Sequence, residues 1–169
     1  MELIDAIMTR RSIRRYTSEK VSDKQLETIL KAAMFAPSAS NRQPWHFIVI
    51  DEKERLLDLT RLHPYAKALE EAPMAILVCG DEELSNKTEY WVQDCSAATQ
   101  NILLAAHALG LGTVWLGVHP KKERIDPISK YFGLPETIHP LSLIALGHPS
   151  ETPSTQDRFR KDRIRHNTW

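Results

Sequence analysis

Residues 91–118, WVQDCSAATQNILLAAHALGLGTVWLGV, carry the strongest periodic signal in the chain. From Trp91 to Leu109, apolar side chains recur in alternating steps of four and three residues, which is the spacing of one helix face. Gly110 is suited to end such a helix, and residues 113–118 have the composition of a strand. The stretch therefore predicts a long, buried helix that leads directly into a strand.

The opposite side of the same helix is also apolar, at Ala97, Leu104 and Ala108. A single sheet would cover only one of these two sides. We expect the second side to be buried as well, and a helix–helix contact between two copies of the chain would bury it.

The flanking patterns predict the remaining elements. We expect helices at residues 2–9, from Ser22 to before Pro37 and at 121–131, and strands at 45–50, 74–79 and 140–146. Ser22 and Gln25 match a capping box at the start of the second helix. The order α, α, β, β, α, β, α, β predicts an α+β domain with a sheet of about four strands between helical layers.

The chain has 169 residues, a length typical of one domain, and its 42% hydrophobic and 26% charged composition is ordinary for a globular protein. Its 22 basic residues balance 22 acidic ones, so no overall charge favours nucleic acid or an anionic membrane. The charge is unevenly placed, however. Residues 10–20 hold five basic residues and one acidic residue, and residues 156–169 hold five basic and two acidic residues.

Several classes of protein are not expected. Cys79 and Cys95 lie in apolar runs without a disulfide framework, so we expect buried thiols in a reducing compartment. Neither a secretory signal nor a membrane segment is recognisable, which predicts a cytoplasmic protein. The seven histidines lack metal-ligand spacing and no nucleophile motif occurs, so we expect neither a metal nor hydrolase chemistry.

Residues 10–16, RRSIRRY, form an arginine segment. Four arginines in six residues are compatible with a solvated face, with a phosphate site or with nucleic acid binding. Arginine forks and a serine hydroxyl can hold phosphate oxygens through short hydrogen bonds. One short cluster on a chain without net charge supports nucleic acid binding only weakly.

Residues 37–45, PSASNRQPW, are a polar segment bounded by prolines. This segment is compatible with a plain loop that enters a strand. It is also compatible with a rigid loop in which Ser38, Asn41 and Gln43 read the edge of a heterocycle.

Residues 110–117, GLGTVWLG, contain three glycines but match no nucleotide motif. A dinucleotide fingerprint requires glycine where Trp115 stands, and a phosphate-binding loop requires different residues from Val118 and His119. A helix end followed by a strand explains the segment.

Residues 150–169, called the tail below, are polar and basic, show no periodicity and end in Trp169. An aromatic residue in that position indicates that the tail docks, either on its own chain or on a partner.

Four motifs occur in a fixed order: RRSIRRY at 10–16, APSASNRQPWHFIVI at 36–50, ALGLGTVWLG at 108–117 and RHNTW at 165–169. In this order they resemble the FMN-dependent nitroreductase family, and the resemblance covers the whole chain. It implies an α+β, three-layer nitroreductase fold with a mixed central sheet flanked by helices, in an intertwined homodimer. Residues 1–149 would form the FMN-binding domain, and the tail would be an extension that wraps the partner subunit.

The resemblance also implies how FMN is bound between the two subunits. The arginine segment and the tail would hold the phosphate and ribityl groups, with Arg14 near flavin N1 and O2. The 37–41 loop of the other subunit would lie against the isoalloxazine, and the backbone of residues 115–117 would face N5 and O4. Gln43 and Arg160 are left open as further contacts. The implied FMN contacts are Arg10, Arg11, Ser12, Arg14, Pro37, Ser38, Ala39, Asn41, Trp115, Leu116, Gly117 and Arg158.

The implied activity is that of an oxidoreductase. NAD(P)H would reduce bound FMN by hydride transfer to N5, and the flavin would then reduce a nitroaromatic, a quinone or a similar small molecule in a ping-pong scheme. Because this chemistry belongs to the flavin, no catalytic side chain is expected. A different flavin reaction, such as dehydrogenation, dehalogenation or flavin destruction, and a non-catalytic flavin-binding or storage role remain as alternatives.

Two features depart from the family pattern. The connection from Gly80 to the long helix is too short for the helical insertion that covers the flavin in many members, so a more open site is expected. Gln156 stands where some relatives carry a tail lysine.

Overall fold

A four-stranded sheet lies at the centre of the fold, with its strands in the order β1-β2-β4-β3. The computed structural model describes residues 1–154 and 156–169. All three strand pairings are antiparallel, so the sheet is antiparallel and the expectation of a mixed sheet is wrong for these four strands; only an isolated bridge between Ser12 and Thr113 is parallel. The strands are β1 (Trp45–Ile50), β2 (Met74–Asp81), β3 (Gly112–Gly117) and β4 (Ile138–Gly147).

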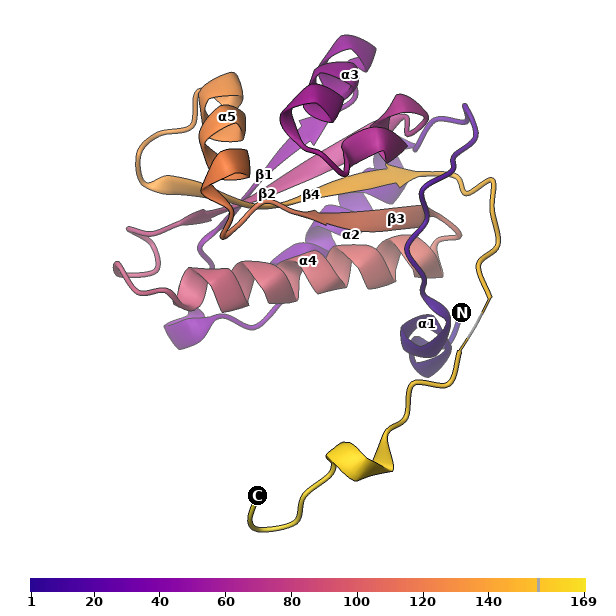
Figure 1. Ribbon diagram of the computed structural model, residues 1–169, viewed down its shortest axis with the longest axis vertical. Helices are drawn as coiled ribbons and strands as arrows, with labels where there is room; N and C mark the ends of the chain where they lie inside the picture. Colours follow the sequence, from indigo (N-terminus) through magenta and orange to yellow (C-terminus); the bar gives the residue numbers. More distant parts are fainter. Residues whose placement is uncertain (155) are drawn as a thin grey trace.

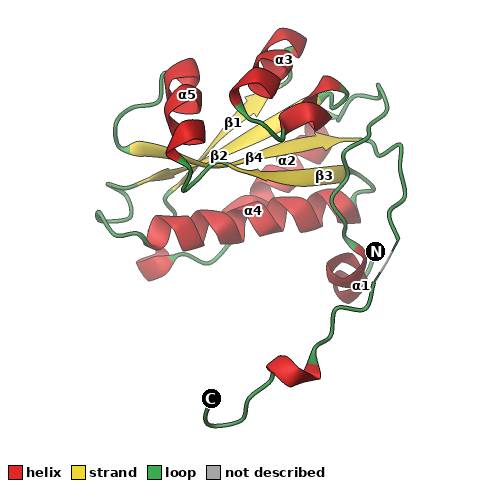
Figure 2. Cartoon of the chain, viewed as in Figure 1, coloured by secondary structure: helices red, strands yellow, loops and turns green. Residues whose placement is uncertain are grey.

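Helices cover both faces of this sheet and form the predicted three layers (Figure 1). One face packs against α3, α5 and the short helix η2, and the other packs against α2 and α4. Figure 2 shows the same arrangement, with the sheet between two layers of helices. The α-helices are α1 (Leu3–Thr9), α2 (Asp23–Met34), α3 (Lys53–Leu62), α4 (Tyr90–Ala108) and α5 (Lys122–Phe132), and the 3-10 helices are η1 (Ala39–Asn41), η2 (Ala66–Glu70) and η3 (Lys161–Arg163).

The periodic stretch forms α4 and β3, as predicted. Trp91, Cys95 and Ile102 are buried against the sheet. On the second side of α4, Leu104 is half-buried and Ala108 is exposed. The second side is therefore only partly covered within one protomer.

Helix α3 is an element that the sequence patterns did not predict. Six of its ten residues are charged or polar, and only Leu56 and Leu59 are buried, so its apolar stripe is too narrow to stand out. Ion pairs three residues apart, Glu52 with Arg55 at 2.9 Å and Asp58 with Arg61 at 3.0 Å, line its exposed side. Helix α3 and η2 fill the connection from β1 to β2.

The arginine segment runs along the open edge of β3 and contacts the start of the tail. The Ile13 amide donates to the Thr113 carbonyl at 2.9 Å, and the Thr17 amide donates to the His148 carbonyl at 2.9 Å. Beyond this region the tail passes α1 and extends away from the three layers (Figure 1). Trp169 is fully exposed, so the tail end does not dock on its own protomer.

The remaining expectations concern the thiols, metals and membranes. Cys79 and Cys95 are buried and unpaired, as predicted. Within residues 1–154 and 156–169, no cluster of three or more histidine, cysteine or carboxylate side chains could hold a metal ion. No helix in that part of the chain combines the length and the apolar character needed to cross a bilayer.

Candidate functional site

The structure brings the arginine segment and the tail together at Arg10. This guanidinium is partly buried at the end of α1, and its pKa is lowered by burial and by the neighbouring charges of Arg158 and Arg11. Both charges that act most on Arg10 are therefore positive. Two adjacent guanidinium groups, of Arg10 and Arg11, and a third from Arg158 in the tail form a cationic cluster, which is suited to a multiply charged anion.

Backbone contacts hold the start of the tail against the arginine segment. One Glu151 oxygen accepts from the backbone amides of Arg14 at 2.5 Å and Arg15 at 3.1 Å. The Ser150 amide donates to the Arg15 carbonyl at 3.0 Å. In addition, the Arg11 guanidinium donates to the Ser154 carbonyl at 3.4 Å. These bonds hold the first residues of the tail beside the arginine segment.

A cavity of about 460 Å³ adjoins the arginine segment and contains four of the expected FMN contacts. Arg14 and the end of β3 both line it, with Lys67 as a second cation and no carboxylate in the lining. The lining residues are Arg14, His63, Pro64, Tyr65, Lys67, Val114, Trp115, Leu116 and Gly117. The cavity thus combines two cations with the exposed aromatic rings of Tyr65 and Trp115.

The backbone of β3 determines which groups can face this cavity. In an antiparallel pair the backbone groups of alternate residues point toward the partner strand. Because the Thr113 carbonyl points outward to Ile13, the backbone groups of Trp115 and Gly117 also point away from β4, whereas those of Leu116 point toward it. Leu116 therefore lines the cavity, but its backbone amide points toward β4 and is not free to bind a ligand there.

His63 fixes the end of β3 from inside the protein. It is 1% exposed, and its Nδ1 accepts from the Tyr65 amide at 3.2 Å. Nε2 therefore carries the proton and donates to the Gly117 carbonyl at 2.9 Å, an oxygen that also accepts from the Arg124 guanidinium at 2.8 Å. Burial, and to a lesser degree the charge of Arg124, lowers the pKa of His63 and favours its neutral form.

His63, Tyr65 and Lys67 are lining residues that sequence reasoning missed. They follow α3 in a connection without any recognised motif. Only the fold, which places η2 beside the end of β3, brings them to the cavity. The sequence gives no spacing signal that could have identified them.

The expected ring-contacting loop lies at the other end of α4. The Ala39 amide donates to Asp94 Oδ1 at 3.0 Å near the start of the helix. The arginine segment adjoins the end of the helix, where Thr9 Oγ1 and His107 Nε2 are 2.9 Å apart. Asp94 and His107 are thirteen residues apart on α4, a separation of about 20 Å along its axis. One protomer therefore does not bring Pro37, Ser38, Ala39 and Asn41 to the cationic cluster.

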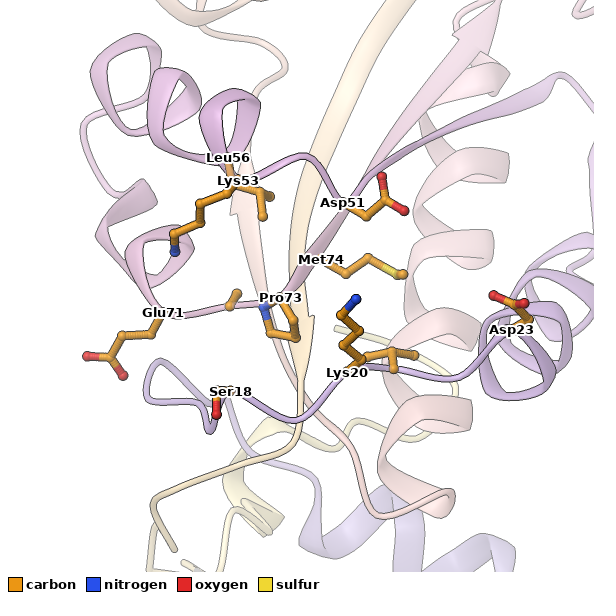
Figure 3. A pocket seen from close by; sticks show the side chains of 11 residues that line it. Ser18, Lys20, Asp23, Asp51, Lys53, Leu56, Glu71, Pro73 and Met74 are labelled. Carbon is orange, nitrogen blue, oxygen red and sulfur yellow. The ribbon is translucent and has the colours of Figure 1, made fainter.

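A second cavity of about 460 Å³ lies between the start of α3, the start of β2 and residues 18–23 (Figure 3). Its polar lining mixes the amines of Lys20 and Lys53 with the carboxylates of Asp23, Asp51 and Glu71. It contains none of the expected FMN contacts, and its three carboxylates outnumber its two amines, so it does not suit the phosphate of FMN.

Comparisons with known proteins show which family this chain resembles. The sequence model described as the Nitroreductase family matches residues 7–67 and 58–148. A protein of Methanothermobacter thermautotrophicus, provisionally named an NADH dehydrogenase/NAD(P)H nitroreductase, is 48% identical over 169 residues, which are 100% of this chain and 88% of the relative.

Solved structures extend the similarity to three dimensions. A provisionally named NADH oxidase of Clostridium acetobutylicum is 43% identical with a TM-score of 0.94, over 98% of this chain and 100% of the other. A provisionally named nitroreductase of Desulfovibrio desulfuricans, solved in complex with FMN, is 37% identical with a TM-score of 0.87, over 100% and 98% of the two chains. The fold, the motifs and the family match coincide over nearly the whole chain, so it belongs to the nitroreductase family.

Proposed function

We propose that the chain is an FMN-dependent oxidoreductase that takes electrons from NAD(P)H and reduces a small organic acceptor such as a nitroaromatic or a quinone. The family makes the general oxidoreductase role plain, and relatives carry names that include NAD(P)H and structures that contain FMN. The observation that carries the proposal is that the charges of Arg11 and Arg158 act on Arg10, on the same segment whose Arg14 lines the cavity at the end of β3.

The donors of this region fit FMN. A phosphate dianion would neutralise the cationic cluster, in which the positive charges now act on one another. Ser12 lies on the same segment and offers a hydroxyl, while Arg14 and Lys67 supply positive charge in the adjoining cavity. The outward backbone groups of Trp115 would face the flavin ring from the open edge of β3.

FMN, when bound, accepts two electrons from NAD(P)H and passes them to the acceptor. For each acceptor molecule reduced by two electrons, one NAD(P)H and one proton are consumed. Positive charge from Arg14 and Lys67 would stabilise negative charge on the ring, and the fixed end of β3 would orient it. His63 is held neutral by burial and donates its proton to a backbone carbonyl, so we assign it to positioning and not to proton transfer.

The site requires a second copy of the chain. The 37–41 loop and the cationic cluster lie near opposite ends of α4, so a single FMN could contact both only if the loop came from a partner. An unusual number of large apolar side chains are exposed on α1 and on the tail, and a homodimer wrapped by the tail would cover them. These side chains are Leu3, Ile4, Ile7, Met8, Phe159, Ile164 and Trp169.

We further propose residues 1–149 as the FMN-binding domain and the tail as the extension that reaches the partner. Strands β3 and β4 both precede the tail, and they complete the four-stranded sheet within that domain. The unpaired thiols of Cys79 and Cys95 support a reducing compartment such as the cytoplasm.

The experiment that tests the proposal is purification without added cofactor, followed by FMN reconstitution, size measurement and stopped-flow reduction. We expect a yellow dimer whose flavin absorbance is bleached by NADH or NADPH under anaerobic conditions. Initial-rate plots against a nitroaromatic or quinone should give parallel lines, as expected for two separate half-reactions. A protein that takes up no FMN would refute the proposal, and one that binds FMN but is reduced by neither nucleotide would indicate a flavin-binding role instead.

A further inference from the structure

The 37–43 loop is held in an unusual backbone conformation. Ser40, Asn41 and Gln43 have positive φ angles of 49°, 54° and 50°, in the left-handed region that non-glycine residues rarely occupy. Three such residues within four positions need contacts that hold them, because a free loop would relax to ordinary angles. Strain of this kind concentrates where a loop must present a defined surface.

Bonds within the loop account for part of that restraint. The Gln43 amide donates to Ser38 Oγ at 3.0 Å, and the Gln43 side chain donates to Asn41 Oδ1 at 2.9 Å. The Asn41 amide donates to the Ser38 carbonyl at 3.0 Å. These bonds fix the shape of the loop but do not attach it to the body of the protein.

Asp94 provides the attachment. Its Oδ1 accepts from the Ala39 amide at 3.0 Å, which ties the middle of the loop to the second turn of α4. The side chain is 6% exposed, and its second oxygen, Oδ2, is buried without a hydrogen-bond partner among the described residues. A buried carboxylate with only one of its oxygens satisfied is costly for folding.

Asp94 occupies a position on α4 where packing alone would favour an apolar residue. It lies three residues after Trp91 and four before Ala98, and therefore on the apolar side of α4 where a hydrophobic residue would pack well. Folding alone gives no reason for a carboxylate there. The attachment of the loop gives one.

We propose that Asp94 is a positioning residue: its carboxylate holds the strained 37–43 loop in the conformation that contacts the cofactor of a second copy of the chain. This inference rests on the proposed function for the identity of the cofactor. Asp94 does not itself touch the cofactor, because Oδ1 is bonded to the Ala39 amide and Oδ2 is buried inside the protein.

The inference predicts that loop order and fold stability respond differently to substitution. Asp94→Leu removes the acceptor and the buried charge, so the loop loses its attachment while the body keeps an apolar contact. Asp94→Asn keeps an oxygen acceptor for the Ala39 amide and serves as the conservative variant. Thr99→Val is the matched control, because Thr99 is a fully buried polar residue of the same helix that bonds to Cys95 and Ser142 and not to the loop.

Hydrogen–deuterium exchange of the peptide that covers residues 36–44 is the first measurement, carried out on apoprotein. We expect exchange of the Ala39 amide region to accelerate at least tenfold in Asp94→Leu and to change less than twofold in Asp94→Asn and Thr99→Val. The melting temperature of Asp94→Leu should equal or exceed that of the parent. If Asp94→Leu does not fold, Asp94→Ala, which adds no bulk, replaces it with the same expectation for exchange.

FMN titration is the second measurement. We expect Asp94→Leu to bind FMN at least tenfold more weakly and Asp94→Asn to stay within twofold of the parent. Unchanged loop exchange in Asp94→Leu, or unchanged FMN affinity despite faster exchange, would overturn the inference. Absence of FMN binding by the parent would refute the proposed function, and the exchange result would still decide whether Asp94 anchors the loop.

Discussion

Replacement of Arg10 by alanine tests the electrostatic centre of the proposed site. Arg10 is partly buried, and its burial, together with the like charges of Arg158 and Arg11, lowers its pKa. The fold therefore gains nothing from its charge in the apoprotein. We expect Arg10→Ala to bind FMN more weakly while the apoprotein keeps or slightly raises its melting temperature.

The size of the effect follows from the kind of bond that would be lost. A hydrogen bond to a charged group contributes about 1.5–3 kcal/mol, which corresponds to roughly 10- to 150-fold in affinity. The lower half of that range is expected, because Arg11 and Arg158 remain nearby and no longer repel a third charge. Raising the salt concentration should weaken FMN binding by the parent more than by the variant, since the variant has one cation fewer to screen.

Fluorescence quenching of FMN by apoprotein, measured at two salt concentrations, gives the affinities. Thermal melts with and without FMN separate binding from folding, because a ligand raises the melting temperature only as far as it binds the folded state. Arg55→Ala is the control: it also removes one arginine charge, from an exposed pair with Glu52 on α3, at a site outside the cavity.

The result that refutes the reasoning is specific. If Arg10→Ala binds FMN as tightly as Arg55→Ala does, the cationic cluster is not the phosphate site. If instead the apoprotein of Arg10→Ala melts far below the parent, Arg10 stabilises the fold, and ligand binding does not explain its presence.

Three further predictions concern other parts of the chain. Because burial holds the pKa of His63 below its ordinary value, the unfolded chain takes up that proton first, so the free energy of unfolding should fall as the pH drops below about 6.5, and urea titrations should show a smaller fall in His63→Gln. Burial raises the thiol pKa of Cys79 and of Cys95 to about 12, so a thiol reagent at pH 8 should label neither cysteine in the native protein and both in guanidinium chloride. In Gly80→Ala the new Cβ would lie 2.3 Å from Trp91 Cε3, and a melt should show a loss of about 1–3 kcal/mol of stability; an unchanged melting temperature would mean that the indole moves freely.

The sequence predicted the elements whose burial is strongly periodic and missed those whose burial is slight. Helix α4 was evident because its buried positions recur over nineteen residues. Helix α3 buries only Leu56 and Leu59 and is otherwise charged, so its amphipathic pattern is hard to distinguish from a polar loop. Because helix α3 was not predicted, the path of the connection after it, which carries His63 to the cavity, was not predicted either.

The lining of the candidate cavity was predictable where it lies in continuous motifs and not where the topology brings residues together. The charge of Arg158 acts on Arg10, and Arg14 lines one cavity with the end of β3. Lys67 reaches the same cavity through the packing of η2, which no local pattern reveals. Asp94 did leave a signal, a carboxylate on the apolar side of α4, but the regularity of the surrounding pattern obscured it.

Several features of the isolated protomer oppose its own stability, and one event would relieve them together. The cluster around Arg10 repels itself, and the 37–43 loop is strained above a half-satisfied Asp94. The large apolar side chains of α1 and the tail, Trp169 among them, face solvent. Such local conflicts are expected at functional sites, where a residue is kept for a partner and not for the fold. A dianionic cofactor bound between two copies would offset the positive charge of the cluster and contact the loop. The second copy would cover the apolar surface. We infer that cofactor binding and dimerisation are coupled, so the dissociation constant of the dimer should rise when FMN is removed.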